Sequence, residues 1–266
     1  MSSLTKKYLM ALTGIVLVGF VFGHMAGNLQ MFLHPDWINE YAYKLQHLPY
    51  GLIWVVRSVL LLCVVVHIVT AVLLVLENKR ARPVGYSVQN PQVSTFASRT
   101  MRYTGLIVLA FIVYHLAHFT IQSTNPEFKD LETPLVGTAG KHGMESRTLW
   151  GVYDKLTTHG ENPAAAANNV HDVYAMVALG FKSPLVSGFY ILSILLLCMH
   201  LSHGFSSMFQ SIGLRNAVWR GRLELAAKVL SFALFLGFAS LPAAALLGFF
   251  AAHLSSAVEA AGALAH

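Results

Sequence analysis

The stretch Tyr50–Leu76 reads YGLIWVVRSVLLLCVVVHIVTAVLLVL, and it decides the fold class. It contains no acidic residue, and Arg57 is its single permanently charged side chain. A helix needs roughly 20 mostly apolar residues to cross the hydrocarbon core of a bilayer, and this stretch is longer than that. Tyr50–Leu76 is therefore predicted to be a membrane-spanning helix.

Four further stretches share this length and apolar character. The 266-residue chain is 55% hydrophobic and 11% charged, whereas an ordinary soluble domain has roughly 25% charged residues. This composition excludes a disordered chain and a simple soluble globule. We therefore predict one all-α domain over residues 1–266, an integral membrane bundle of five transmembrane helices: Tyr8–Leu33, Tyr50–Leu76, Met101–Ile121, Pro184–Met208 and Leu225–Ala252.

Basic residues gather in alternate loops. The N-terminus and the loops after the second and fourth spans hold eleven Lys and Arg residues, with only Glu77 and Glu224 as acids. The other side holds seven basic and ten acidic residues. Since an excess of Lys and Arg marks cytoplasmic loops, the N-terminus is predicted to be cytoplasmic and the C-terminus outside. The net charge of +6 then reflects membrane orientation rather than nucleic-acid binding.

The loop at residues 122–183 is the longest connection, and it lies on the outer side in this topology. It is too small for an enzyme domain, and a short helix is predicted near Val170–Leu179. No Walker loop, dinucleotide fingerprint or nucleophile elbow occurs in the sequence. We therefore expect no catalytic residue on this chain.

Four histidines lie inside the first four spans: His24, His67, His115 and His200. Ionisable residues are costly in a membrane and point to function. Spans one and three run outward and spans two and four inward. With a rise of roughly 1.5 Å per residue, His24 and His115 fall in the outer half, and His67 and His200 in the inner half. Facing histidine pairs in a helix bundle suit six-coordinate haem iron, so two b haems are predicted.

A repeated pattern supports the outer pair. Thr13-Gly14 lies ten residues before His24, and Thr104-Gly105 lies ten residues before His115. Glycine permits close approach of a flat macrocycle or a neighbouring helix. His118 and His203 each follow a proposed ligand by three residues, so either could replace it geometrically, although the Thr-Gly register favours His115.

Other chemistry was weighed against haem. Cys63 and Cys198 lie in apolar runs and read as small hydrophobic residues, and the absence of Cys-x-x-Cys-His excludes covalently attached haem. A transporter of protons or metal ions could also use intramembrane histidines as a relay. The near-absence of intramembrane acids and the clustering of the histidines at two depths favour haem.

Four segments around these histidines resemble the di-haem cytochrome b subunit of succinate:quinone oxidoreductases, the membrane anchor of succinate dehydrogenase and quinol:fumarate reductase. They are Gly23-His24-Met25, Val66-His67-Ile68, Tyr114-His115-Leu116 and His200-Leu201-Ser202-His203-Gly204. The runs Ser98–Gly105 and Phe209–Gly213 add to a likeness that covers nearly the whole chain. In that family the first ligand pairs with the third and the second with the fourth, and the position of Ile212-Gly213 matches His200 rather than His203.

The resemblance implies an electron-transfer subunit without a succinate or fumarate site of its own, in a tricarboxylic acid cycle enzyme of the bacterial cytoplasmic (inner) membrane. Its partners would be a flavoprotein with FAD and an iron–sulfur protein on the cytoplasmic face, and menaquinone or another quinone in the membrane. The cytochrome b of a hydrogenase or formate dehydrogenase is the alternative within electron transfer. Cys198 stands where some fumarate-reducing relatives have a glutamate, which argues against a compensating proton path by that route.

Several polar residues near span ends are candidates for further contacts. Those that could hold haem propionates are Arg57 at the outer site, and Arg99, Arg102, Ser98 and Tyr103 at the inner site. Snorkelling to the membrane surface is the alternative for the arginines. Asn28 and Glu40 are candidates for a quinone site, against a backbone hydrogen bond for Asn28 and a solvated loop acid for Glu40.

Overall fold

A computed structural model describes residues 1–81, 96–134 and 169–251. Five helices in it are long and apolar enough to cross a membrane, which confirms the predicted all-α membrane bundle. They are α1 (Ser3–Asn28), α3 (Leu52–Arg80), α4 (Phe96–His115), α7 (Pro184–Ser211) and α8 (Trp219–Leu246). Between 11% and 28% of the residues in their most apolar stretches are buried inside the bundle, and the rest are partly or fully exposed, as suits lipid.

The helix ends differ from the predicted spans by several residues, because a helix continues past its apolar run. α1 begins at Ser3 instead of Tyr8, and the side chain of Ser2 caps it by accepting from the Thr5 N–H. α8 begins at Trp219 instead of Leu225, in a polar turn. The predicted end of the fifth span at Ala252 lies outside the described residues.

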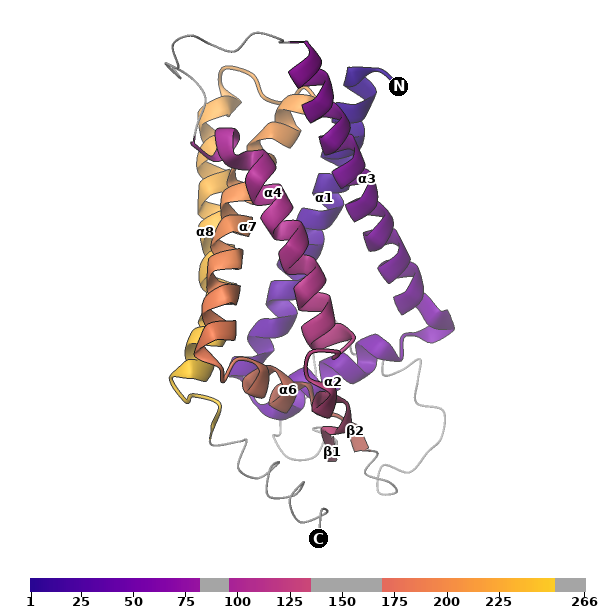
Figure 1. Ribbon diagram of the computed structural model, residues 1–266, viewed down its shortest axis with the longest axis vertical. Coiled ribbons are helices and arrows are strands. Elements are labelled where there is room, and N and C mark those ends of the chain that lie inside the picture. Colours follow the sequence, from indigo (N-terminus) through magenta and orange to yellow (C-terminus); the bar gives the residue numbers. More distant parts are fainter. Residues whose placement is uncertain (82–95, 135–168, 252–266) are drawn as a thin grey trace.

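The long helices form one bundle whose two ends differ in character (Figure 1). α1 packs against α3, α7 and α8, and α7 packs against α4 and α8. One end carries the N-terminus and is here called the N-terminal end. The other, here called the loop end, carries α2 (Pro35–Gln46), α6 (Val173–Gly180) and the strands β1 (Glu132–Pro134) and β2 (Asn169–His171).

Short elements complete the chain path. The 3-10 turns are η1 (Leu29–Phe32), η2 (Pro49–Gly51) and η4 (Pro126–Asp130), and α4 continues directly into the π-helical turn η3 (Leu116–Thr120). β1 and β2 are antiparallel, with Thr133 opposite Val170. The predicted helix near Val170–Leu179 is present as α6, but Val170 belongs to β2, so the predicted start was wrong.

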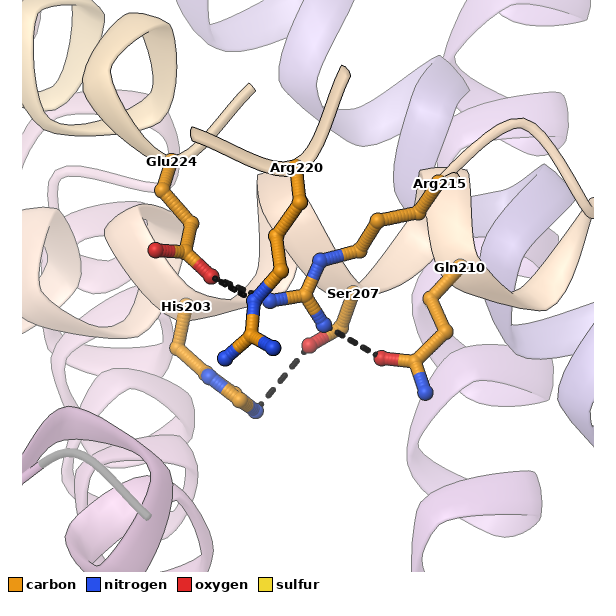
Figure 2. Close-up of polar contacts among 6 residues, drawn as sticks. All are labelled: His203, Ser207, Gln210, Arg215, Arg220 and Glu224. Atoms are coloured by element: carbon orange, nitrogen blue, oxygen red, sulfur yellow. Dashed lines mark hydrogen bonds and ion pairs between the residues drawn. The ribbon is translucent and has the colours of Figure 1, made fainter. Parts of the chain in front are cut away.

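Ion pairs join helices at the N-terminal end. Lys6 of α1, whose side chain is 8% exposed, pairs with Glu77 of α3, and Ser3 also donates to Glu77 (3.0 Å). Arg215, in the turn between α7 and α8, pairs with Glu224, which Arg220 also contacts at 3.2 Å (Figure 2). These ion pairs therefore lie at the end of the bundle that carries most of its basic residues.

A buried polar network joins α2 to α6 at the loop end. Asn39 donates to the Asp172 carboxylate (3.1 Å) and accepts from the Tyr174 N–H (3.0 Å). Asp172 also accepts from the Ala175 N–H (2.9 Å), as the N-cap of α6. Buried polar groups stabilise only when they are hydrogen-bonded, so this network fixes how α6 sits against α2.

Replacing Asn39 by alanine should therefore destabilise the loop end by about 2 kcal/mol, because the change leaves the Tyr174 N–H buried without its acceptor. Thermal unfolding in detergent, followed by circular dichroism, measures this. The matched control is Asn125→Ala, which removes a surface contact with Glu127 (2.9 Å) and should change the midpoint little. Equal midpoints for the two variants would contradict the role given to Asn39.

Candidate functional site

The four intramembrane histidines lie on four different helices and at two levels of the bundle. His24 and His115 are near the loop-end termini of α1 and α4. His67 of α3 contacts Thr13 of α1, eleven residues before His24 (24 − 13). With a rise of roughly 1.5 Å per residue, this puts His67 about 16 Å along α1 from His24. His200 is level with Thr104, eleven residues before His115 (115 − 104).

His24 and His115 form the loop-side pair. Their ring centroids are 5.8 Å apart and their planes are nearly perpendicular, at 83°. Aromatic rings surround them: Phe20 stacks on His24 at 5.4 Å, and Phe111 lies 5.9 Å from His115. Nδ1 of His115 is buried without a hydrogen-bond partner among the described residues. Buried nitrogens of folded proteins are usually hydrogen-bonded, so Nδ1 of His115 differs from the other three rings in this respect.

His67 and His200 form the N-terminal-side pair, and each is held by a threonine of the neighbouring helix. Thr13 Oγ1 lies 3.2 Å from His67 Nδ1, and Thr104 Oγ1 lies 3.4 Å from His200 Nδ1. The two rings are close enough for their charges to interact. The two histidines therefore have the same environment on different helices.

The threonines also bond their own helices. The Thr13 hydroxyl lies 2.8 Å from the Leu9 carbonyl, and the Thr104 hydroxyl lies 3.0 Å from the Met101 carbonyl. A hydroxyl hydrogen donated to that carbonyl leaves the threonine oxygen to accept from Nδ1–H of the histidine, and Nε2 then keeps its lone pair. Histidines that bind metals are oriented in this way, with the second nitrogen donating to an outer partner.

The Thr-Gly repeat shares its register with His24 and His115 but contacts the other two histidines. The sequence placed Thr13-Gly14 and Thr104-Gly105 in register with His24 and His115, whereas the structure sets them against His67 and His200. A Cβ on Gly105 would lie 3.3 Å from Cε1 of His200, and one on Gly14 would lie 3.6 Å from Cε1 of His67. Glycine at these positions therefore lets the rings lie against the neighbouring helix.

The two spare histidines are occupied elsewhere. His118 is buried in η3, and its Nδ1 lies 3.0 Å from the Tyr190 hydroxyl, away from the pair formed by His24 and His115. His203 Nε2 lies 3.0 Å from the hydroxyl of Ser207 on the same helix, beside Arg215 (Figure 2). Each already has a polar partner, unlike Nδ1 of His115.

Each histidine pair offers only two ligands, which suits a metal ion that a bound cofactor already coordinates. Among the described residues, no group of three or more His, Cys, Asp or Glu gathers as a metal site would require. Two imidazoles at each level instead suit a macrocycle that supplies four ligands and leaves two axial positions. The apolar and aromatic neighbours of the loop-side pair suit the same group, so the residues fit haem.

The arginines predicted to hold propionates lie near the bundle ends. Arg57 lies over the ring of Trp54 at 5.0 Å. Arg102 donates to the Tyr103 hydroxyl (3.1 Å) and lies over its ring at 4.8 Å, and both residues are exposed. Ser98 and Arg99 are one turn earlier on α4. Within the described ranges, no hydrogen bond joins Arg57, Arg102 or Tyr103 to the four histidines.

The two residues considered for a quinone site have local partners. Glu40 forms an ion pair with Lys44 one turn later (2.7 Å). Asn28 donates to the carbonyl of His24 (2.8 Å), and its amide nitrogen lies 3.4 Å from Nε2 of the same ring. Asn28 is therefore part of the surroundings of His24, whereas Glu40 lies on α2 at the surface.

Sequence reasoning missed the threonine partners of His67 and His200. It also missed the contact between Gln122 and His171 at the loop end. Gln122 Nε2 lies 3.0 Å from His171 Nε2, and Gln122 has a left-handed backbone, with φ of 57°. The Thr-Gly repeat was the available signal for the threonines. A positive φ at a glutamine has no sequence signal, because asparagine and glycine are the residues that favour it.

No family model, curated protein or solved structure matches this chain.

Replacing Tyr190 by phenylalanine tests whether His118 is structural. The change leaves Nδ1 of a buried histidine without its partner and should lower the free energy of unfolding by about 1–3 kcal/mol. Thermal unfolding measures it, with the exposed Tyr43→Phe as the control. An unchanged midpoint for Tyr190→Phe would mean that the hydroxyl does not hold His118.

Proposed function

We propose that this chain is the membrane anchor and electron-transfer subunit of a succinate:quinone oxidoreductase, and that it holds two b haems. His24 and His115 would ligate one, and His67 and His200 the other. The observation that carries the proposal is the arrangement of four histidines from four helices as two pairs at two levels. The family resemblance of the same four segments supports it.

The chain's own residues would supply ligation, orientation and a dry environment. Neutral imidazole brings a ligand into the bilayer without carrying charge there. Thr13 and Thr104 would keep Nδ1–H of His67 and His200 occupied, so that Nε2 is the ligand atom. Haem, when bound, adds the one-electron chemistry that these side chains lack. Axial ligands, hydrogen bonds and burial together set the reduction potential.

Charge supports the proposed orientation and partners. Basic side chains at the N-terminal end, among them Lys79, Arg99 and Arg222, mark that end as cytoplasmic. An iron–sulfur protein and its flavoprotein, which carries FAD and the succinate or fumarate site, would dock there. Electrons would then pass along the bundle to menaquinone or another quinone in a bacterial inner membrane.

Two rival functions make different demands on the protein. A proton or ion transporter needs a continuous polar path, whereas Phe20, Phe111 and Phe238 enclose the loop-side pair. The cytochrome b of a hydrogenase or formate dehydrogenase would use the same histidines. Copurification separates these complexes, because a flavoprotein marks the proposed enzyme and nickel or molybdenum marks the others.

The purified complex should contain two haem b per chain in a pyridine haemochrome assay with protein quantitation. Replacing His24, His67, His115 or His200 singly should lower that ratio, because each change removes an axial ligand. Replacing His118 or His203 should leave it at two. Two haems retained in every variant of the first set would refute the ligand assignment.

Removal of the Thr104 hydroxyl should loosen the haem at the N-terminal side. Loss of such an outer hydrogen bond typically weakens metal binding about 10–100-fold. Thr104→Val keeps the side-chain shape, and Thr100→Val on the same helix is the control, because Thr100 donates only to the backbone of its own helix (3.0 Å to Phe96). Competition with added imidazole, followed by absorbance, measures retention. Equal retention by both variants would contradict the role of Thr104.

A further inference from the structure

A pocket of about 450 Å³ opens at the loop end of the bundle. It lies where the first turn of α3, the end of η3 and strand β2 meet. Its lining residues are Gln46, Ile53, Trp54, Arg57, Thr120, Gln122, Lys129 and His171. Pockets of this size hold small molecules or head groups.

The pocket carries two positive charges and no negative one among the residues that line it. Arg57 and Lys129 are its cations, and its remaining polar groups are amides, a hydroxyl, an imidazole and an indole. The contact of Arg57 within the described part of the chain is the ring of Trp54, and no acid there pairs with Lys129. Like charges around one cavity repel each other unless an anion lies between them.

Two of the polar residues that line the pocket, Gln122 and His171, already have hydrogen-bond partners within the protein. His171 donates from Nδ1 to the Leu131 carbonyl (3.1 Å), so its Nε2 accepts from Gln122 (3.0 Å). Gln122 also contacts the sulfur of Met176 (3.1 Å). These bonds hold the strained backbone of Gln122 in place. Among the described residues, Arg57 and Lys129 are then the groups of the pocket that can bind an anion.

The position of the pocket indicates the source of the anion. Trp54 is in the first turn of a membrane-spanning helix, at the depth where interfacial aromatic residues and lipid head groups meet. Beyond it, α3 exposes an apolar surface that includes Val55, Val59 and Leu62. α3 packs on α1, and Figure 1 shows the two helices spreading apart toward the loop end.

We propose that this pocket binds the phosphate of an anionic phospholipid, with its acyl chains along the exposed surface of α3. Arg57 would contact the phosphate with its guanidinium and Lys129 with its ammonium group. The lipid would hold the loop end of α3 in place. The contact of α3 with the other long helices is its packing on α1. This inference does not depend on the two haems.

The test uses the intact purified complex in nanodiscs of phosphatidylglycerol or of phosphatidylcholine. Native mass spectrometry after transfer to detergent counts the lipids that stay bound. A basic residue near an anionic surface contributes about fivefold in affinity, so Arg57→Gln and Lys129→Gln should each weaken phosphatidylglycerol retention about fivefold, and the double variant about 25-fold. Phosphatidylcholine, without net charge, should be retained less by the unmodified protein.

Two controls match the substitutions. Arg222 lies over the ring of Trp219 at 5.3 Å at the opposite end of the bundle, so Arg222→Gln removes an arginine of the same geometry. Lys182→Gln removes an exposed lysine beyond α6 that does not line the pocket. Neither should change the retention of phosphatidylglycerol.

Four outcomes would overturn the lipid assignment. Two concern the lipid itself: unchanged phosphatidylglycerol retention in the double variant, and equal retention of phosphatidylcholine by the unmodified protein. The other two are binding of inorganic phosphate in place of lipid, and a raised KM for quinol with unchanged lipid retention, which would assign the pocket to quinone. Haem content is measured on the same samples. A loss of haem in Arg57→Gln with unchanged lipid would assign Arg57 to a propionate, whereas a colourless unmodified complex would refute the proposed function and leave the lipid result standing.

Discussion

An imidazole inside a membrane is costly when charged, and its buried nitrogens are most stable with a partner, so the surroundings of the four histidines are the main constraint on the bundle. At the N-terminal-side level, a threonine from the neighbouring helix occupies one nitrogen of His67 and of His200. Each threonine hydroxyl also lies within hydrogen-bond distance of a carbonyl of its own helix, so its oxygen can accept from the ring. At the loop-side level, Nδ1 of His115 is buried without a partner in the described part of the chain, and aromatic side chains lie beside the ring.

Different polar contacts join the helices and loops at the two ends of the bundle. At the N-terminal end, ion pairs cross between helices, as in the link from Lys6 to Glu77. At the loop end, Asn39 and Asp172 join segments 133 residues apart in the chain through hydrogen bonds that water does not reach. α3 has neither kind of link at the loop end among the described residues, and the cationic pocket lies beside it.

The sequence predicts the bundle well because each span is a local property. Twenty apolar residues are recognisable without knowledge of their neighbours, and the histidine depths follow from the rise of a helix. The partner of a side chain is not a local property. The Thr-Gly repeat was visible as a spacing shared by α1 and α4, but the histidines that it contacts, His67 and His200, lie on other helices. The strand pair, α2 and the left-handed Gln122 likewise depend on contacts between distant segments. The cytoplasmic location of the N-terminus and the haem ligands stay predictions.

Low-temperature electron paramagnetic resonance of the oxidised complex, combined with near-infrared magnetic circular dichroism, tests the central claim most directly, because together they report the axial ligands of ferric haem. The account predicts two low-spin signals of bis-histidine type, one lost when His24 is replaced and the other lost when His67 is replaced. Absence of haem signals, or a single replacement that abolishes neither of them, would contradict it.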